Sequence, residues 1–259
     1  MPVQRSRLQS LPLAGHAAEV LVATEPDLHF AAHWHDAWSV GAIGAGECRF
    51  ACNGQAHHAH ADDVIVMPPF AVHTAGVSTG RFEMVMLYLP ISWVDAAMGW
   101  PPGHRPLGAR VVRRDAPLAG MLGRAVMERR GDRLAAAVAL ALERTLPEPA
   151  EFIPVATAEP RVQALCEALQ ADPPQTVQLD ALAREIGLSR EHAHRLFRRA
   201  IGLTPREYER LARIAQAKRL LREGSSIAHA AADCGFADQA HFSRWFRRYF
   251  GVTPAAYEP

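Results

Sequence analysis

The sequence has no long run of apolar residues, which excludes an ordinary membrane-spanning helix. Apolar residue types make up 49% of its 259 residues, but no run reaches the roughly 18 residues that a bilayer span requires. The first residues, MPVQRSRLQSLPLAG, are too poor in apolar side chains for a secretory signal peptide. We therefore expect a cytoplasmic protein with no membrane partner and with enough apolar residues for the cores of two domains.

Cysteine is scarce, and we expect no disulfide framework in a chain of this size. The chain has four cysteines: Cys48, Cys52, Cys166 and Cys234. If ECRFAC is a strand, the Cys48 and Cys52 thiols lie about 13 Å apart along it, too far to share one zinc ion. The nearby His57, His58 and His60 do not change that distance. Ordinary strand cysteines with reduced thiols are therefore the better interpretation.

A large net charge is also missing, but the charge is unevenly distributed. The formal net charge is +1. Residues 176–259 carry 14 Lys and Arg against 9 Asp and Glu, a net of +5, whereas residues 1–175 carry 14 against 18, a net of −4. A basic C-terminal third beside a mildly acidic body predicts a polyanionic partner at that end only.

Short alternating stretches, broken by Gly, Asn, Asp and Pro, characterise the N-terminal part. They recur roughly every ten residues: AEVLVATE, WSVGAIGAG, ECRFACNG, DDVIVMPP and RFEMVMLYLP. This pattern predicts a sandwich or small barrel over residues 1–100.

Beyond residue 100 the pattern becomes helical. PLAGMLGRAVMERR and DRLAAAVALALERTL are predicted helices with Asp115 and Asp132 as their N-caps. The second helix has an apolar stripe, formed by Leu134, Val138, Ala141 and Leu142. PEPAEFIPVATAEP is rich in proline and has no period, so residues 101–159 are predicted to be a helical region that ends in an interdomain linker.

One segment of the C-terminal third occurs twice. FRRAIGLTPREY starts at Phe197 and FRRYFGVTPAAY starts at Phe246. Around each copy the sequence predicts a short helix, a turn containing glycine, and a second helix with a basic outer face, capped by Ser189 in one unit and Asp238 in the other. The predicted inward faces are Ala193, Leu196, Phe197 and Ala200 in one second helix and Phe242, Trp245, Phe246 and Tyr249 in the other. Each unit is therefore predicted to be a helix-turn-helix.

The residues between the two units predict a stiff spacer. Thr204-Pro205-Arg206-Glu207 is a capping box with proline at the first helical position, and Gly224 ends the helix that it opens. Such a helix is roughly 27 Å long at about 1.5 Å per residue. Successive major grooves on one face of B-DNA are about 34 Å apart, so one chain can hold two recognition helices near adjacent grooves.

The segment CGFADQAHFSRWFRRYFGVTPAAY is close to the signature of the AraC/XylS family of bacterial transcription regulators. Residues 160–259 resemble the DNA-binding domain of that family along their whole length, which implies a seven-helix domain whose third and sixth helices enter the major groove. The resemblance implies base-edge contacts by Glu191, His194, Arg195, Gln239, Ala240, Ser243 and Arg244. Four further arginines are more plausible phosphate contacts: Arg198, Arg199, Arg247 and Arg248.

Three histidines draw attention in the N-terminal domain. HFAAHWHDAW contains His33 and His35, whose spacing on a strand places both imidazoles on one face, and DDVIVMPPFAVH brings His73. This order is similar to the cupin barrels of AraC-type sensor domains, although Phe70 stands where glycine is usual.

The three histidines allow three interpretations. They can form the polar part of a pocket for a small effector, which Trp34 and Trp38 would also line. They can bind a divalent metal, as similar histidines do in related cupin enzymes. They can also be packing residues with no ligand.

The predicted architecture is α+β with two domains, a cupin-like barrel with accessory helices and an all-α double helix-turn-helix domain over 160–259. The leading hypothesis is a transcription regulator of the activator kind and not an enzyme. Its expected partners are promoter DNA, a small effector and RNA polymerase. The family resemblance implies that the helices of residues 116–146 pair two subunits, and packing on their own barrel alone is the alternative. The competing functional hypothesis is a cupin metalloenzyme whose helical tail serves only for assembly.

Overall fold

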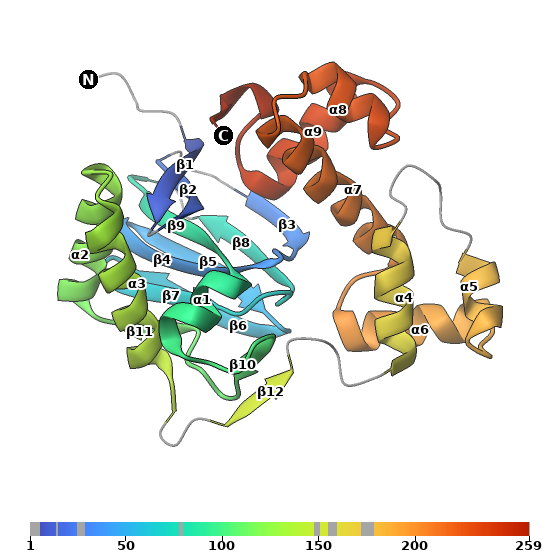
Figure 1. The fold of residues 1–259 in the computed structure, drawn as a ribbon, viewed down its shortest axis with the longest axis horizontal. Helices are drawn as coiled ribbons and strands as arrows, with labels where there is room; N and C mark the ends of the chain where they lie inside the picture. The colour runs from blue at the N-terminus through green and yellow to red at the C-terminus, as the bar shows by residue number, and fades with distance from the viewer. Residues whose placement is uncertain are drawn as a thin grey trace. The chain divides into compact units, whose positions relative to one another are not determined.

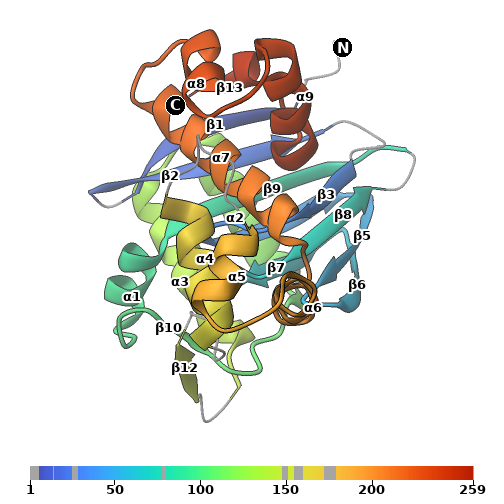
Figure 2. The same ribbon diagram turned by 90° about the vertical axis from the view of Figure 1, so that its right-hand side faces the viewer.

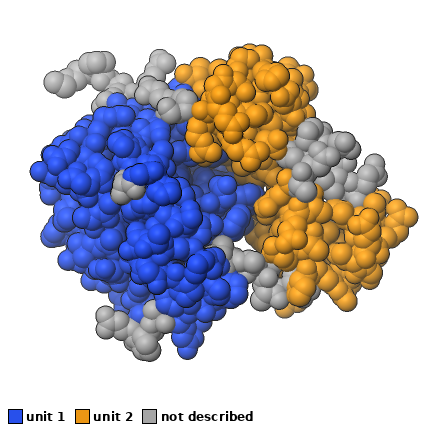
Figure 3. Space-filling view, in the orientation of Figure 1, with its two compact units in different colours: residues 1–155, 250–252, 256–259 blue, residues 156–249, 253–255 orange. Residues whose placement is uncertain are grey.

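The computed structural model describes residues 6–13, 15–24, 29–77, 80–147, 151–154, 160–171 and 179–258. The chain divides into two compact units (Figure 3). The N-terminal unit comprises Met1–Val155, Phe250–Val252 and Ala256–Pro259, and the C-terminal unit comprises Ala156–Tyr249 and Thr253–Ala255.

Two main β-sheets build the N-terminal unit (Figure 1). The larger sheet contains, in spatial order, β11 (Val112–Arg114), β7 (Asp63–Met67), β4 (Ala37–Ala45), β9 (Glu83–Pro90), β2 (His16–Ala23), β1 (Arg7–Leu13) and β13 (Tyr257–Glu258). The smaller sheet contains β3 (His29–His33), β8 (His73–Val77), β5 (Glu47–Cys52) and β6 (Gln55–His60). All five predicted strand stretches are strands, namely β2, β4, β5, β7 and β9.

The central strands β4 and β7 are buried on both faces, which explains their nearly continuous apolar sequence. Val40 and Val64 belong to the apolar core that includes residues of the helices. Ile65 and Met67 line a cavity to which the smaller sheet also contributes. β7 therefore separates the helical layer from the cavity.

A two-residue turn joins β5 to β6. Asn53 and Gly54 have φ angles of 48° and 77°, as a type I′ hairpin turn requires. The resulting register pairs Glu47 with His60. Because alternate residues of a strand share a face, His58 lies on the same face of the hairpin as these two.

Three helices complete the N-terminal unit: α1 (Ile91–Met98), α2 (Ala116–Met127) and α3 (Gly131–Thr145). Helices α2 and α3 lie along the larger sheet (Figure 1), and the predicted apolar stripe of α3 is buried in the common core. The carboxylate of Asp115 caps α2 as predicted, accepting a hydrogen bond from the Leu118 N–H at 3.2 Å.

The predicted N-cap of α3 is wrong. Arg130 is the N-cap, and Asp132 lies inside the first turn, ion-paired with Arg130 at 2.9 Å. A Cβ atom at Gly131 would lie 2.6 Å from the carbonyl oxygen of Pro12, which only glycine avoids. The helix therefore begins where this glycine lets the chain approach β1.

Part of the predicted linker is ordered as a strand. β12 (Phe152–Pro154) pairs antiparallel with β10 (His104–Pro106), so this part of the predicted linker has regular structure although its sequence shows no period. The Phe152 ring anchors β12 by an edge contact with Trp100 at a centroid distance of 5.7 Å. Residues 148–150 and 155–159 of the predicted linker lie outside the described part of the chain.

The C-terminal unit is helical. Its elements are α4 (Pro160–Ala171), α5 (Leu179–Glu185), α6 (Arg190–Ile201), α7 (Pro205–Arg222), α8 (Ile227–Asp233), α9 (Gln239–Phe250) and the 3-10 helix η1 (Pro254–Ala256). The pairs α5–α6 and α8–α9 are the two predicted helix-turn-helix units. In the described residues no helix has both the length and the apolarity needed to cross a bilayer. The predicted combination of a β-rich and an all-α domain is confirmed.

Candidate DNA-binding helices and effector cavity

Local capping sets the start of α6, the first predicted recognition helix. The Ser189 hydroxyl accepts a hydrogen bond from the His192 N–H at 3.2 Å, as the sequence predicts. Ala193 and Phe197 are buried, and Leu196 is half-buried, so three of the four predicted inward residues face the core to some degree. Ala200, the fourth, is exposed, so its predicted inward position is wrong. The small methyl group of an alanine costs little when it is left in water.

The outward side of α6 carries the residues predicted to meet DNA. Glu191, Arg195, Arg198 and Arg199 are exposed, and His194 is half-buried. Both Arg198 and Arg199 lie in the last turn of the helix, where positive charge also complements the helix dipole.

Helix α9 repeats this design in the second unit. The Asp238 carboxylate accepts a hydrogen bond from the His241 N–H at 2.5 Å, which confirms the predicted cap. Phe242 and Phe246 are fully buried, with ring centroids 5.5 Å apart. The predicted DNA contacts of this helix are exposed except for Ser243, which is half-buried: Gln239, Ala240, Ser243, Arg244, Arg247 and Arg248.

Trp245 is only half-buried, although the helical period of α9 predicts an inward position. The guanidinium of Arg210 lies over its ring, 3.9 Å from the centroid, and Tyr249 stacks on it at 5.6 Å. A cation–π contact thus covers one ring face and joins α9 to α7. Helical periodicity cannot reveal this contact because Arg210 belongs to a different helix.

The spacer helix α7 is 18 residues long and begins with the predicted capping box. The Glu207 N–H donates to the Thr204 hydroxyl at 3.2 Å, and the Thr204 N–H donates to the Glu207 carboxylate at 2.8 Å. Helices α6 and α9 lie at opposite ends of α7 (Figures 1 and 2).

A groove of about 710 Å³ lies in the C-terminal unit beside α6, α7 and α9. Four arginines contribute to its lining: Arg190, Arg206, Arg210 and Arg213. Arg213 is ion-paired with Glu209, and Arg190 with Asp180 at 3.3 Å. Because His194 and Trp245 also line it, the groove adjoins both predicted recognition helices with a predominantly basic surface.

In the N-terminal unit, the structure brings His33, His35 and His73 together. All three are buried, and their ring centroids are 4.2 to 5.2 Å apart. β3 ends at His33, so His35 reaches the cluster from the segment after the strand and not, as predicted, from the strand itself. The pairing of His33 with His73 between β3 and β8 brings in the third imidazole.

Hydrogen bonds to the backbone orient two of the rings. Nδ1 of His33 lies 2.7 Å from the Ala31 carbonyl oxygen, and Nδ1 of His73 lies 2.8 Å from the Ala71 carbonyl oxygen. A carbonyl oxygen only accepts, so each Nδ1 carries the proton and each Nε2 presents a lone pair. Burial lowers the pKa of His73 to about 4, and burial together with the neighbouring His73 lowers the pKa of His33 well below its usual value. Both rings are therefore neutral at pH 7.

Neutral imidazoles suit either a hydrogen-bonding effector or a metal ion. One ring nitrogen from each histidine can be chosen so that all three lie within 4.8 Å of one another, which fits a three-histidine donor set. The adjacent Asp36 is exposed, so it does not join the buried cluster.

The cavity beside this cluster is small and mostly apolar. Its volume is about 40 Å³, room for a few water molecules at most. His33, His73, Thr74 and Tyr88 supply polar groups to an otherwise apolar lining. Burial, and secondarily the charge of Glu19, raises the pKa of Tyr88, so its phenol stays neutral.

The two tryptophans predicted for this pocket lie elsewhere. Trp38 belongs to the core beneath the helices, with its ring 5.3 Å from Trp100. Trp34 is buried against Phe70 at a centroid distance of 5.3 Å. Phe70 has a φ angle of 60°, the left-handed conformation that glycine adopts most readily. This explains why the family resemblance implies glycine at that position.

Comparison with known proteins identifies the family. The model of the AraC-like ligand binding domain matches residues 16–148, and the model of a helix-turn-helix domain matches residues 182–258. The chain belongs to the AraC family of transcriptional regulators. As a member of the AraC family, it is a transcription regulator with an N-terminal ligand-binding domain and a C-terminal DNA-binding domain.

Individual relatives agree with this assignment to the AraC family. The uncharacterized HTH-type transcriptional regulator YbfI of Bacillus subtilis is 27% identical over 222 residues, which cover 82% of this chain and 81% of YbfI. The HTH-type transcriptional activator RhaS of Escherichia fergusonii is 40% identical over 70 residues, 27% of this chain and 25% of RhaS. The crystal structure of ToxT from Vibrio cholerae O395 shares the fold, with a TM-score of 0.61 and 14% identity over 92% of this chain and 95% of ToxT.

Proposed function

We propose that α6 and α9 enter two successive major grooves on one face of a promoter duplex. The observation that carries this proposal is the pair of capped helices with basic outer sides at opposite ends of one 18-residue helix. At about 1.5 Å per residue, α7 is roughly 27 Å long, which suits grooves about 34 Å apart.

The exposed or half-buried residues near the start and middle of each helix would contact the base edges. In α6 these are Glu191, His194 and Arg195, and in α9 they are Gln239, Ala240, Ser243 and Arg244. Arginine can bind guanine through two hydrogen bonds, glutamine can bind adenine, and glutamate accepts from cytosine. Arg198, Arg199, Arg247 and Arg248, at the ends of the helices, would bind phosphates and set the register.

A spacing experiment on the DNA tests the two-groove arrangement. Footprinting of the full chain upstream of neighbouring genes would locate a site with two protected major-groove segments. We expect insertion of 5 base pairs between these segments to weaken binding at least tenfold, because half a turn rotates one groove away. Insertion of 10 base pairs should weaken it as well, because α7 has a fixed length. Equal affinity for all three duplexes would show that one helix alone binds specifically.

In the N-terminal domain, we propose that the cavity beside His33, His35 and His73 receives the effector. Neutral imidazoles can donate to or accept from a small polar group, while Met84 and Met86 supply flexible apolar walls. Because the cavity holds about 40 Å³, an effector larger than a few atoms must displace these side chains. Effector binding would then favour one of two arrangements of the regulator over the other. If the domain instead takes a divalent metal, the same three histidines would hold it.

RNA polymerase is the proposed protein partner at the promoter. We propose the cytoplasm as the location of the regulator, because its proposed target is promoter DNA. The named relatives are transcription regulators, which favours a regulator without catalytic activity of its own. We further propose a homodimer formed through α2, because Met121 and Met127 on this helix are exposed apolar residues at 37% and 57%.

A further inference from the structure

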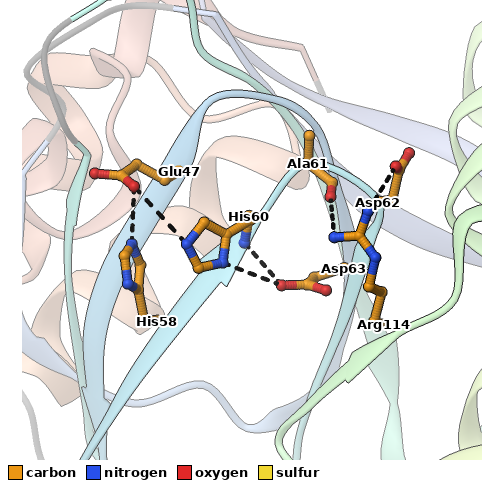
Figure 4. A network of polar contacts seen from close by, with 7 residues as sticks. All are labelled: Glu47, His58, His60, Ala61, Asp62, Asp63 and Arg114. Carbon is orange, nitrogen blue, oxygen red and sulfur yellow. Dashed lines mark hydrogen bonds and ion pairs between the residues drawn. The ribbon is translucent and has the colours of Figure 1, made fainter.

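A second cluster of metal-binding side chains lies on the outer face of the β5–β6 hairpin. Nε2 of His58 lies 3.0 Å from Oε2 of Glu47, and Nε2 of His60 lies 3.9 Å from the same oxygen (Figure 4). The rings of His58 and His60 are 4.0 Å apart between centroids. None of these residues belongs to the buried histidine cluster or lines the cavity described above.

The Asn53–Gly54 turn brings these side chains together. It allows a two-residue loop, so Glu47 lies directly across the hairpin from His60, and His58 follows on the same face. His57 is the neighbour on the opposite face, where its ring stacks on Phe50 at 5.1 Å. The cluster is therefore a product of strand alternation and hairpin register.

A carboxylate behind the cluster supports a ligand role for His60. Oδ2 of the buried Asp63 accepts a hydrogen bond from the His60 backbone N–H at 2.8 Å and lies 3.8 Å from Nδ1 of the same ring (Figure 4). Histidines that bind metals commonly direct their second nitrogen to a carboxylate, which orients the other nitrogen toward the ion. Here Asp63 is near Nδ1, and Nε2 points toward Glu47.

We propose that Glu47, His58 and His60 form a binding site for a divalent transition ion of the zinc type. Two imidazoles and one carboxylate are a donor set that such ions accept, with water completing the coordination. The three ligand atoms already lie within 4.8 Å of one another. At metal–ligand distances of about 2.0–2.1 Å, tetrahedral ligands are roughly 3.3 Å apart. Because the three side chains are partly exposed, they can rotate to bring their ligand atoms to this shorter separation.

The bound ion has a defined structural consequence. It would join β5 to β6 on the outer face and stabilise the smaller sheet, because only the folded hairpin presents all three ligands together. Without an ion, the same contacts are histidine–carboxylate pairs at the surface, with Arg49 4.0 Å from the other oxygen of Glu47.

Zinc titration of the tag-free, chelator-treated full chain tests the proposal, with isothermal calorimetry for affinity and melting temperature for stability. We expect one zinc ion per chain and a higher melting temperature with zinc. The variants H58Q, H60Q and E47Q should each weaken zinc binding at least tenfold and lose the thermal shift. H57Q, altered on the same strand but on the opposite face, should bind within twofold of wild type.

Three results would overturn the site. Zinc binding that is undetectable up to millimolar concentration would show an ordinary ion-pair cluster. Undiminished binding in both H58Q and H60Q would place the ion elsewhere, and equal loss in H57Q would mean that the substitutions disturb the hairpin as a whole. Melting temperatures of the metal-free variants near that of wild type establish that each of them is folded.

Discussion

At the residue scale, the arginines of α6 and α9 fall into two classes by their place on each helix. Arg195 and Arg244 occupy equivalent positions six residues after their caps, Ser189 and Asp238, and both are exposed. The arginines of the last turns follow one helical turn later. A helix that enters a groove at its N-terminal part brings its earlier residues to the bases and its later ones toward the backbone. This ordering underlies the division into base and phosphate contacts.

Replacement of Arg244 by alanine should lower affinity for the cognate duplex by roughly 1–3 kcal/mol and relax specificity at one base pair. Replacement of Arg247 by alanine should weaken binding to all sequences alike. It should also reduce the magnitude of the slope of log K against log [salt] by about 0.9. Fluorescence anisotropy on cognate and scrambled duplexes at several salt concentrations measures both effects. If Arg244→Ala weakens all sequences equally, Arg244 is a phosphate contact.

The buried His73 predicts a loss of stability in acid. Burial lowers its pKa from 6.5 to about 4, so between these values the unfolded chain binds a proton that the folded chain does not. The stabilisation is fully present above pH 6.5 and is lost as the pH falls toward 4, by roughly 3 kcal/mol for this residue alone. Urea unfolding followed by tryptophan fluorescence at pH 7 and pH 4.5 should show this loss in wild type and a smaller one in His73→Gln. An equal loss in both proteins would assign the acid sensitivity to other groups.

At the element scale, α7 depends on its first turn. Thr204 and Glu207 satisfy each other's backbone N–H groups, and the hydrogen bond from the Thr204 N–H is the main reason that the pKa of Glu207 is lowered. Pro205 needs no N–H partner at this position. The helix start is thus fixed by adjacent residues, while its inner face packs on α4 and α8.

Thr204→Ala should destabilise the C-terminal unit by about 1 kcal/mol, because the Glu207 N–H loses its acceptor. Thr204→Ser keeps the hydroxyl and should retain most of the stability. Urea unfolding of the full chain, followed by far-ultraviolet circular dichroism, compares the two variants. A serine variant as unstable as the alanine variant would show that the threonine methyl group, and not the cap, matters.

At the scale of the whole molecule, α2 combines a buried apolar side with two exposed methionines on the opposite side. Leu118 and Leu122 face the core, whereas Met121 and Met127 face solvent. A dimer of the ligand-binding domain would link two DNA-binding units. This link raises the effective concentration of each unit at a repeated site and so strengthens binding.

Met121→Glu should shift the protein from dimer to monomer, because a charge would be buried in the proposed interface. Leu107 is also an exposed apolar residue, at 45%, but it lies outside α2, so Leu107→Glu is the matched control. Sedimentation velocity at tens of micromolar protein distinguishes the two variants. A monomeric wild type, or equal dissociation in both variants, would contradict a dimer formed through α2.

Much of the C-terminal unit could be predicted from the sequence, because its determinants are local. Ser189, Thr204 and Asp238 each cap a helix through a backbone group three residues away, and the structure confirms all three. The buried Phe242 and Phe246 follow from the helical period. Trp245 does not, because its partner Arg210 comes from another helix.

The candidate sites of the N-terminal unit were less predictable. The Asn-Gly turn is a sufficient signal for the opposition of Glu47 and His60, because a two-residue loop fixes the hairpin register. In contrast, the sequence named His33, His35 and His73 together, but nothing local predicts that His35 reaches the cluster after β3 has ended, nor that Trp38 packs under the helices.

The sequence by itself determined the family, the two capped helix-turn-helix units and the length of the helix between them. These depend mainly on hydrogen bonds and apolar spacing between side chains a few residues apart, which the sequence states directly. Tertiary structure alone decided where α3 begins, how His35 reaches the buried cluster after β3 has ended and how little space lies beside that cluster. Those outcomes depend on how distant segments pack, and close packing leaves each of them to be settled by neighbours that the local sequence does not name.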